Sequence, residues 1–68
     1  MIPGRKIREL RKSKGLSQRE FAKLAGLSQS YISELENGIK TNPSLSVIKK
    51  ISKALKVDIK VFIEEGEQ

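Results

Sequence analysis

The segment at residues 17–38 constrains the fold of this 68-residue chain more than any other. Ser17 is a helix-start residue followed three positions later by Glu20, so each side chain can bond to a free backbone N–H group near the other. Gly26 can take the positive φ that ends a helix sharply, and Ser28 repeats the start signal directly afterwards. The pattern predicts two short helices joined by a tight turn, at about residues 18–25 and 29–36.

Three further helices are expected around this pair. An amphipathic segment begins at Arg5 and is ended by Gly15. Ser44 can cap a fourth helix, and Asp58 can cap a short fifth one. The chain is therefore expected to be all-α, with five short helices and tight connections. The apolar positions expected to build the core are Ile7, Leu10, Phe21, Leu24, Ala25, Tyr31, Ile32, Leu35, Leu45, Ile48, Ile51 and Leu55.

The composition excludes several classes of protein. The chain has neither cysteine nor histidine, which rules out disulfides and zinc sites built from the usual ligands. Neither a paired-carboxylate pocket nor a glycine-rich phosphate loop is visible, so we expect no enzyme activity, no cofactor and no small-molecule ligand. Apolar runs reach only two or three residues, so no membrane contact is expected. We expect a single domain over residues 1–68, with a core at about 5–63 and an acidic tail at 64–68.

Charge is distributed unevenly along the chain. The net charge is +6, but residues 1–16 and 39–60 each carry +5, while residues 17–38 carry −1 and residues 61–68 carry −3. Two basic blocks thus flank a nearly neutral central pair of helices. A basic field attracts polyanions, of which nucleic acid is the commonest.

The predicted helix at 29–36 divides into two unlike halves. At about 100° per residue, Tyr31, Ile32 and Leu35 fall on one half and short polar side chains on the other. An ordinary solvated face is more often filled with Lys and Glu, whereas Gln, Ser and Glu can bond to base edges in the DNA major groove. The residues predicted to read bases are Gln29, Ser30, Ser33 and Glu34.

These residues resemble the helix-turn-helix of the Cro and phage-repressor family, also called the xenobiotic-response-element family. Within the motif the resemblance rests on Gln18, on the small Ala22 where the two helices touch, and on Gly26 in the turn. It continues in the sequences LSQ at 16–18, SYISELENG at 30–38 and TNPSL at 41–45. It covers about residues 5–63. The family resemblance implies a lambda-repressor-like fold and a cytoplasmic transcriptional regulator of the repressor type, associated with the nucleoid when it binds double-stranded DNA.

The resemblance also implies roles for individual residues. Gln18 would bond to a phosphate and brace Gln29, which is expected to read a base directly. Phosphate contacts fix the register of a protein on DNA without reading its sequence. Arg11 and Glu36 would form an internal ion pair. The phosphate-contacting residues implied in the loop after the recognition helix are Asn37, Lys40, Thr41 and Asn42.

The chain departs from the family pattern at three places. Glu34 puts an anion on the reading face, so the target sequences of relatives cannot be transferred. Lys56 stands where glycine is common, and a left-handed lysine would cost about 1 kcal/mol. Val61 stands where a polar residue is usual, and with Ile59 and Ile63 it leaves more apolar surface than a small core uses. We therefore expect a homodimer that reads a palindrome with its recognition helices ~34 Å apart.

Alternative functions remain open within this fold. A restriction–modification controller protein would share the compact dimer and the NPSL-like loop. An antitoxin-like or other protein–protein module would need an apolar outer face on residues 29–36, which Gln29 and Ser30 argue against. The chain can also be the DNA-binding piece of a longer regulator.

Overall fold

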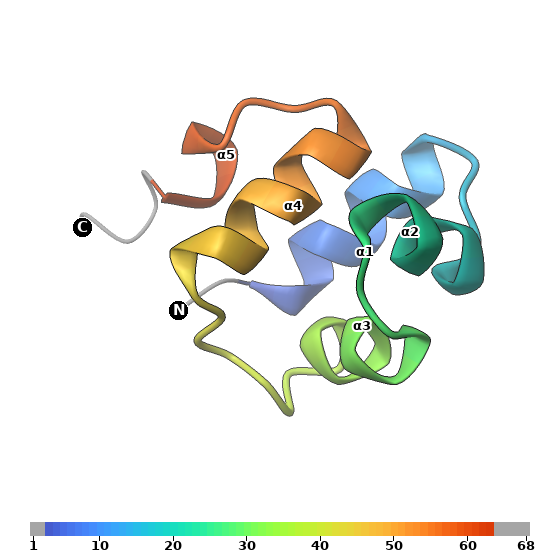
Figure 1. Cartoon of the computed structure of the whole chain (residues 1–68), viewed down its shortest axis with the longest axis horizontal. Helices are drawn as coiled ribbons and strands as arrows, with labels where there is room; N and C mark the ends of the chain where they lie inside the picture. The colour runs from blue at the N-terminus through green and yellow to red at the C-terminus, as the bar shows by residue number, and fades with distance from the viewer. Residues whose placement is uncertain (1–2, 64–68) are drawn as a thin grey trace.

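The computed structural model describes residues 3–63, apart from the Ile63 side chain, and consists of helices joined by short connections. These helices are α1 (Gly4–Ser13), α2 (Gln18–Ala25), α3 (Gln29–Glu36), α4 (Leu45–Leu55) and α5 (Lys60–Ile63). The all-α prediction is confirmed, with no strand among the described residues. The expected acidic tail at 64–68 lies outside them. In Figure 1, α1 and α4 occupy the middle of the molecule, and α2 and α3 lie to one side.

Local side-chain caps set where the helices begin. The Ser17 backbone N–H donates to Glu20 Oε1 at 2.9 Å, and the Glu20 N–H donates to Ser17 Oγ at 3.0 Å, which completes the predicted capping box. Ser28 Oγ and Ser44 Oγ each accept a backbone N–H three residues on. Asp58 Oδ1 accepts the N–H of Lys60 at 2.9 Å. The first turn of each helix from α2 to α5 is therefore fixed by its own short sequence.

Gly26 makes the turn between α2 and α3. It has φ 71° and ψ 32°, and its N–H donates to carbonyl groups at the end of α2. Left-handed backbone of this kind disfavours residues with a Cβ. Lys56 adopts the same conformation, φ 58° and ψ 43°, after α4, as its place in the family pattern predicted. This lysine carries the cost that glycine would avoid.

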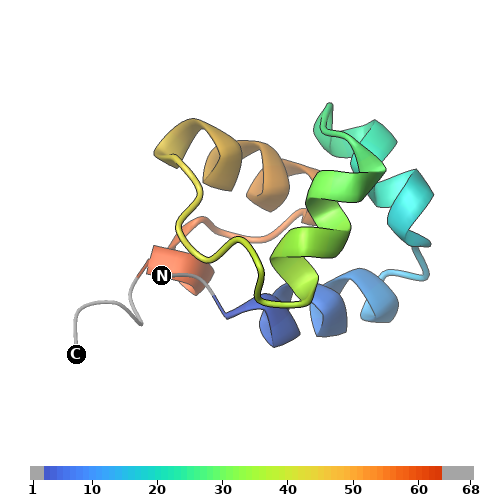
Figure 2. The same ribbon diagram turned by 90° about the horizontal axis from the view of Figure 1, so that it is seen from below.

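One apolar core joins all five helices. Among the described side chains, nine are buried in it: Ile7, Phe21, Ala22, Ala25, Ile32, Leu35, Ile51, Leu55 and Phe62. Helix α3 packs against both α1 and α2, and α2 packs against α4. Seen from below, α3 lies beside the first turn of α1, and residues 37–44 run from the end of α3 to α4 (Figure 2). Helix α3 is thus held from two sides.

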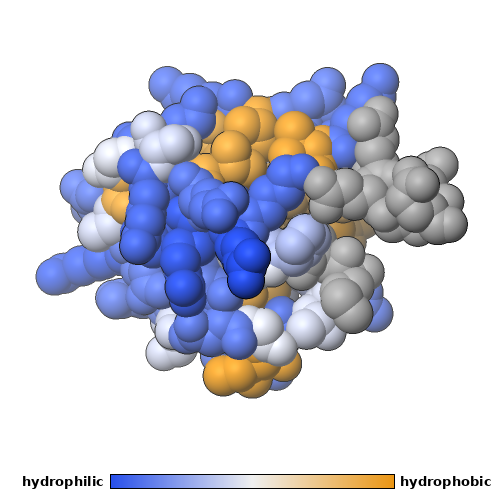
Figure 3. All heavy atoms as spheres, turned by 180° about the vertical axis from the view of Figure 1, so that it is seen from behind, coloured by the Kyte–Doolittle hydropathy of each residue, from blue (hydrophilic) through white to orange (hydrophobic). Residues whose placement is uncertain are grey.

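Two predicted core residues lie at the surface instead. Leu24 is 62% exposed because the buried side of α2 consists of Phe21, Ala22 and Ala25, and position 24 lies beside that side of the helix. Leu45 is 54% exposed because it opens α4 at the end remote from α2 (Figure 1). Figure 3 shows that the back of the molecule is mostly hydrophilic, with apolar atoms confined to a band and a separate patch. Helical periodicity located the buried faces but not their edges.

Candidate nucleic-acid interface

The polar half of α3 forms an open hollow together with the start of α2. The hollow has a volume of about 420 Å³ and is lined by Gln18, Gln29, Ser30, Ser33 and Glu34. On α3, Gln29 and Ser30 are exposed, whereas Ser33 and Glu34 are half-buried. All four predicted base-reading residues therefore lie on one surface. Opposite them, Ile32 and Leu35 are fully buried and hold the helix down.

Beneath this surface lies an ion pair that links α1 to α3. The Arg11 guanidinium donates from Nε to Glu36 Oε2 at 2.6 Å and from Nη2 to Glu36 Oε1 at 3.0 Å. Both residues are more than nine-tenths buried. Arg11 Nη1 also donates to the backbone oxygen of Leu16 at 2.8 Å, so the guanidinium reaches the α1–α2 connection as well. This is the pair that the resemblance implied.

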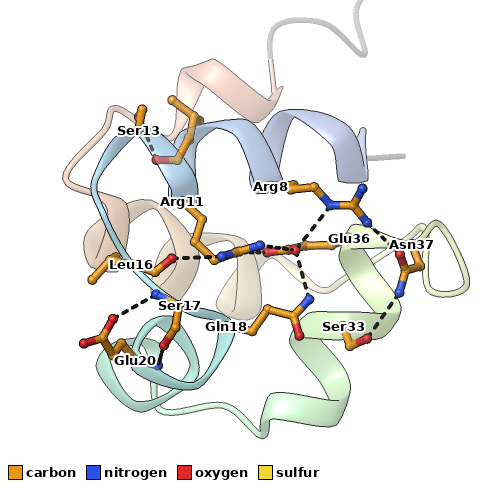
Figure 4. A network of polar contacts seen from close by, with 11 residues as sticks. Arg8, Arg11, Ser13, Leu16, Ser17, Gln18, Glu20, Ser33, Glu36 and Asn37 are labelled. Carbon is orange, nitrogen blue, oxygen red and sulfur yellow. Dashed lines mark hydrogen bonds and ion pairs between the residues drawn. The ribbon is translucent and has the colours of Figure 1, made fainter.

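Two more side chains converge on the Glu36 carboxylate, as Figure 4 shows. Gln18 Nε2 donates to Glu36 Oε1 at 3.1 Å, and Arg8 Nε lies 3.6 Å from the same oxygen. Gln18 therefore touches both the ion pair below and the hollow above it. Arg8 also donates from Nη2 to Asn37 Oδ1 at 2.6 Å. We name Arg8, Arg11, Gln18, Glu36 and Asn37 together the Glu36 network.

Arg8 belongs to this network although no role was predicted for it from the sequence. Its spacing carried a signal, because residues three apart on a helix share a face and Arg8 stands three before Arg11. Its partner Asn37 lies 29 positions further on, and only the packing of α1 against α3 brings them together.

The charges in the Glu36 network settle the protonation of its carboxyl group. Burial raises the pKa of Glu36, but the hydrogen bonds from Arg11 and Gln18 and the charges of Arg11 and Arg8 outweigh burial. The pKa is therefore below its ordinary value of 4.5. Two guanidinium groups face one carboxylate, so the charged groups of the Glu36 network sum to +1. Such a field favours a nearby phosphate.

The segment after α3 carries the predicted phosphate-binding residues. Lys40, Thr41 and Asn42 are exposed, as is Asn37 at the end of the helix. The backbone N–H groups of Ile39 and Lys40 both donate to the carbonyl oxygen of Glu34, at 2.9 and 3.1 Å. These bonds fasten the loop to α3, so its polar side chains border the polar half of that helix.

The predicted dimer residues lie at and beside α5. Ile59 and Val61 are half-buried. Phe62, the residue after Val61, is buried in the core. The side chain of Ile63 lies outside the described part of the chain. Apolar surface therefore remains accessible at Ile59 and Val61.

Two other kinds of site can be considered for residues 3–63. In this part of the chain no three acidic side chains gather as metal ligands would. None of its helices is long and apolar enough to cross a membrane.

The Helix-turn-helix family matches residues 7–62, which include the whole of α2, α3 and α4. The chain belongs to the Cro and phage-repressor helix-turn-helix family. It is 39% identical over 65 residues to the HTH-type transcriptional regulator SinR of Bacillus subtilis, a match that covers 96% of this chain and 59% of SinR. The chain thus spans little more than half the length of that relative.

Solved structures of two other proteins superpose closely on this chain. It superposes on the crystal structure of SinR in complex with DNA with a TM-score of 0.85 and 38% identity, covering 88% of this chain and 95% of that one. It superposes on the restriction–modification controller protein C.AhdI of Aeromonas hydrophila with a TM-score of 0.80 and 44% identity, covering 84% and 85%.

Proposed function

We propose that this helix-turn-helix protein is a sequence-specific transcriptional regulator of the repressor type that binds duplex DNA. The reading face of α3 carries this proposal. It presents hydrogen-bonding side chains from a helix fixed by core packing and by the Glu36 network, and α-helices of this size fit the major groove. A similar protein, SinR, has been crystallised with DNA. We propose that the chain acts in the cytoplasm, joins the nucleoid when bound, and has no catalytic activity.

Phosphate contacts would come from the edges of the reading face. Gln18 stands at the first turn of α2, where the helix N-terminus favours an anion. The exposed residues of the loop after α3 follow next to Glu34, whose carbonyl oxygen accepts two N–H groups of the loop. With Gln29, Ser30, Ser33 and Glu34 between these two edges, the protein would straddle one groove and hold a phosphate backbone on each side.

Dimerisation would complete the site. Ile59 and Val61 offer apolar surface beside α5, and with Ile63 they would form a two-fold interface between copies of this chain. A two-fold dimer places its recognition helices ~34 Å apart and so reads a palindromic operator.

A restriction–modification controller protein is the second candidate. The superposition on C.AhdI favours it, because that match covers most of both chains and has 44% identity. The two candidates share this fold and would differ in the genes that they regulate. An antitoxin-like protein–protein module fits less well, because the outer face of α3 is polar.

Fluorescence anisotropy with labelled duplexes tests the function directly. A duplex obtained by binding-site selection should bind ~10³-fold or more tightly than a random duplex at physiological salt. Because phosphate contacts release counterions, affinity for both should fall steeply as salt rises. Equal affinity for every duplex would reduce the protein to a nonspecific basic binder and overturn the proposal.

Two single substitutions separate base reading from phosphate binding. Gln29→Ala should cost about 1–3 kcal/mol at one base position and relax specificity there. Lys40→Ala should weaken binding to all sequences alike and reduce the salt slope by about one. Selection profiles and salt titrations on both variants make the comparison. If the two variants gave the same profile, the assignment of these roles would be wrong.

A further inference from the structure

One hydrogen-bond chain runs from α1 to the reading face. Arg8 Nη2 donates to Asn37 Oδ1 at 2.6 Å, and Asn37 Nδ2 donates to Ser33 Oγ at 3.2 Å (Figure 4). Arg8 itself is anchored by Glu36 Oε1, 3.6 Å from its Nε. The family resemblance gave Asn37 a phosphate and Ser33 a base, but it gave Arg8 no role.

The chemistry of arginine fixes the donor and the acceptor of both hydrogen bonds in this series, from Arg8 through Asn37 to Ser33. A guanidinium has only donors, so the Asn37 group that faces Arg8 must be its amide oxygen. The NH₂ group of the same amide then faces Ser33 and can only donate. The Ser33 oxygen must therefore accept at this contact, and its own proton is left to donate elsewhere.

We propose that Arg8 is a positioning residue for base recognition, acting through Asn37 to hold the Ser33 hydroxyl as a donor toward DNA. This inference rests on the proposed function. A serine hydroxyl with a freely rotating proton bonds to any base. A hydroxyl whose oxygen is already engaged favours the acceptors of the major groove, which are guanine O6 and N7, adenine N7 and thymine O4. Because one of the two acceptor sites of its oxygen is taken and its proton is free, Ser33 should favour these acceptors over the amine of cytosine.

Replacing Arg8 by lysine keeps the charge and removes the planar fork. A lysine ammonium is a point charge and cannot reproduce the paired geometry toward Glu36 and Asn37. Arg5→Lys is the matched control, because Arg5 is exposed on the same helix and lines one hollow with Arg8, Asn37 and Gly38. The base pair read by Ser33 is first located as the position that Ser33→Ala relaxes in a selection experiment.

At that position Arg8→Lys should lower discrimination roughly fivefold or more, with random-duplex affinity unchanged within about twofold. Arg5→Lys should leave discrimination unchanged. The Arg8→Lys, Ser33→Ala double variant should relax the position no further than Ser33→Ala alone, because both substitutions act through one hydroxyl.

Reversing the bond direction gives an independent measurement. Asn37→Asp places an acceptor-only group between Arg8 and Ser33, so the Ser33 proton would turn toward the carboxylate and its oxygen toward the base. The preference at the Ser33 position should then shift toward the amine-bearing cytosine or adenine. The added negative charge should weaken all duplexes alike, which does not alter this preference.

Failure of the inference is distinguishable from failure of the proposed function. If the wild-type protein binds a selected duplex specifically but Arg8→Lys matches Arg5→Lys in its profile, the positioning role is wrong. Equal weakening of all duplexes by Arg8→Lys would make Arg8 a phosphate contact only, which also overturns it. Additive effects in the double variant would do the same. Absence of specific binding by the wild type would overturn the proposed function itself.

Discussion

Replacing Arg11 by alanine should lower the free energy of unfolding by about 3–5 kcal/mol, because it leaves the buried Glu36 carboxylate without its main partner. The pair is bidentate at 2.6 and 3.0 Å, and Glu36 has a fully buried side chain. Arg8 and Gln18 would remain near the carboxylate, but each contributes only one contact. The loss would be a large part of the stability of a domain this small.

Urea denaturation followed by circular dichroism measures this effect. Lys12→Ala is the matched control, since Lys12 is an exposed cation next to Arg11 on the same helix. A variant that is unfolded even without urea would support the prediction as well as a lowered midpoint would. Equal midpoints for Arg11→Ala and Lys12→Ala would show that the ion pair contributes little to stability.

Acid provides a second measurement of the same pair. Because the pKa of Glu36 is lowered by folding, the pair contributes its full stability above pH 4.5 and loses it as the pH falls through the folded-state pKa. The urea midpoint of the wild type should therefore fall more between neutral pH and about pH 3 than that of Glu36→Gln, which has no proton to take up there. Parallel losses in both proteins would contradict the assignment.

Replacing Gly4 by alanine should destabilise the protein by about 1–3 kcal/mol through overpacking. A Cβ at this position would overlap the Leu35 carbonyl oxygen and come 2.8 Å from that of Glu36. Both obstacles are backbone atoms at the end of α3, so no side chain can rotate away. Helix propensity alone predicts the opposite sign, since alanine inside a helix is favoured over glycine by about 0.5–1 kcal/mol.

The sign of the Gly4→Ala effect therefore decides which factor dominates. Gly15→Ala serves for comparison, because Gly15 has φ 72° but open space around its Cβ position. It should cost about 1 kcal/mol from backbone strain alone. A rise in the urea midpoint for Gly4→Ala would show that α1 does not pack against α3 as closely as described.

Local signals explain why the helices could be predicted so closely. Ser17, Ser28 and Ser44 each bond to a backbone N–H three residues away, so short stretches of sequence fix the helix starts. The polar face of α3 was predictable for the same reason, because helical periodicity is also a local property. The contact of Arg8 with Asn37 was not, since it depends on how α1 packs against α3. The exposure of Leu24 and Leu45 likewise depends on neighbouring helices.

The four residues of the proposed reading face differ in how easily they can be substituted in evolution or redesign, because the Glu36 network holds only one of them. Among the described residues, Ser33 is tied to this network, whereas Gln29, Ser30 and Glu34 make no side-chain hydrogen bonds and lie outside the core. Substitutions at these three positions can alter the target sequence with little cost in folding. A substitution at Ser33 also leaves the Asn37 amide without its acceptor. New binding specificities of this protein should therefore arise first at positions 29, 30 and 34.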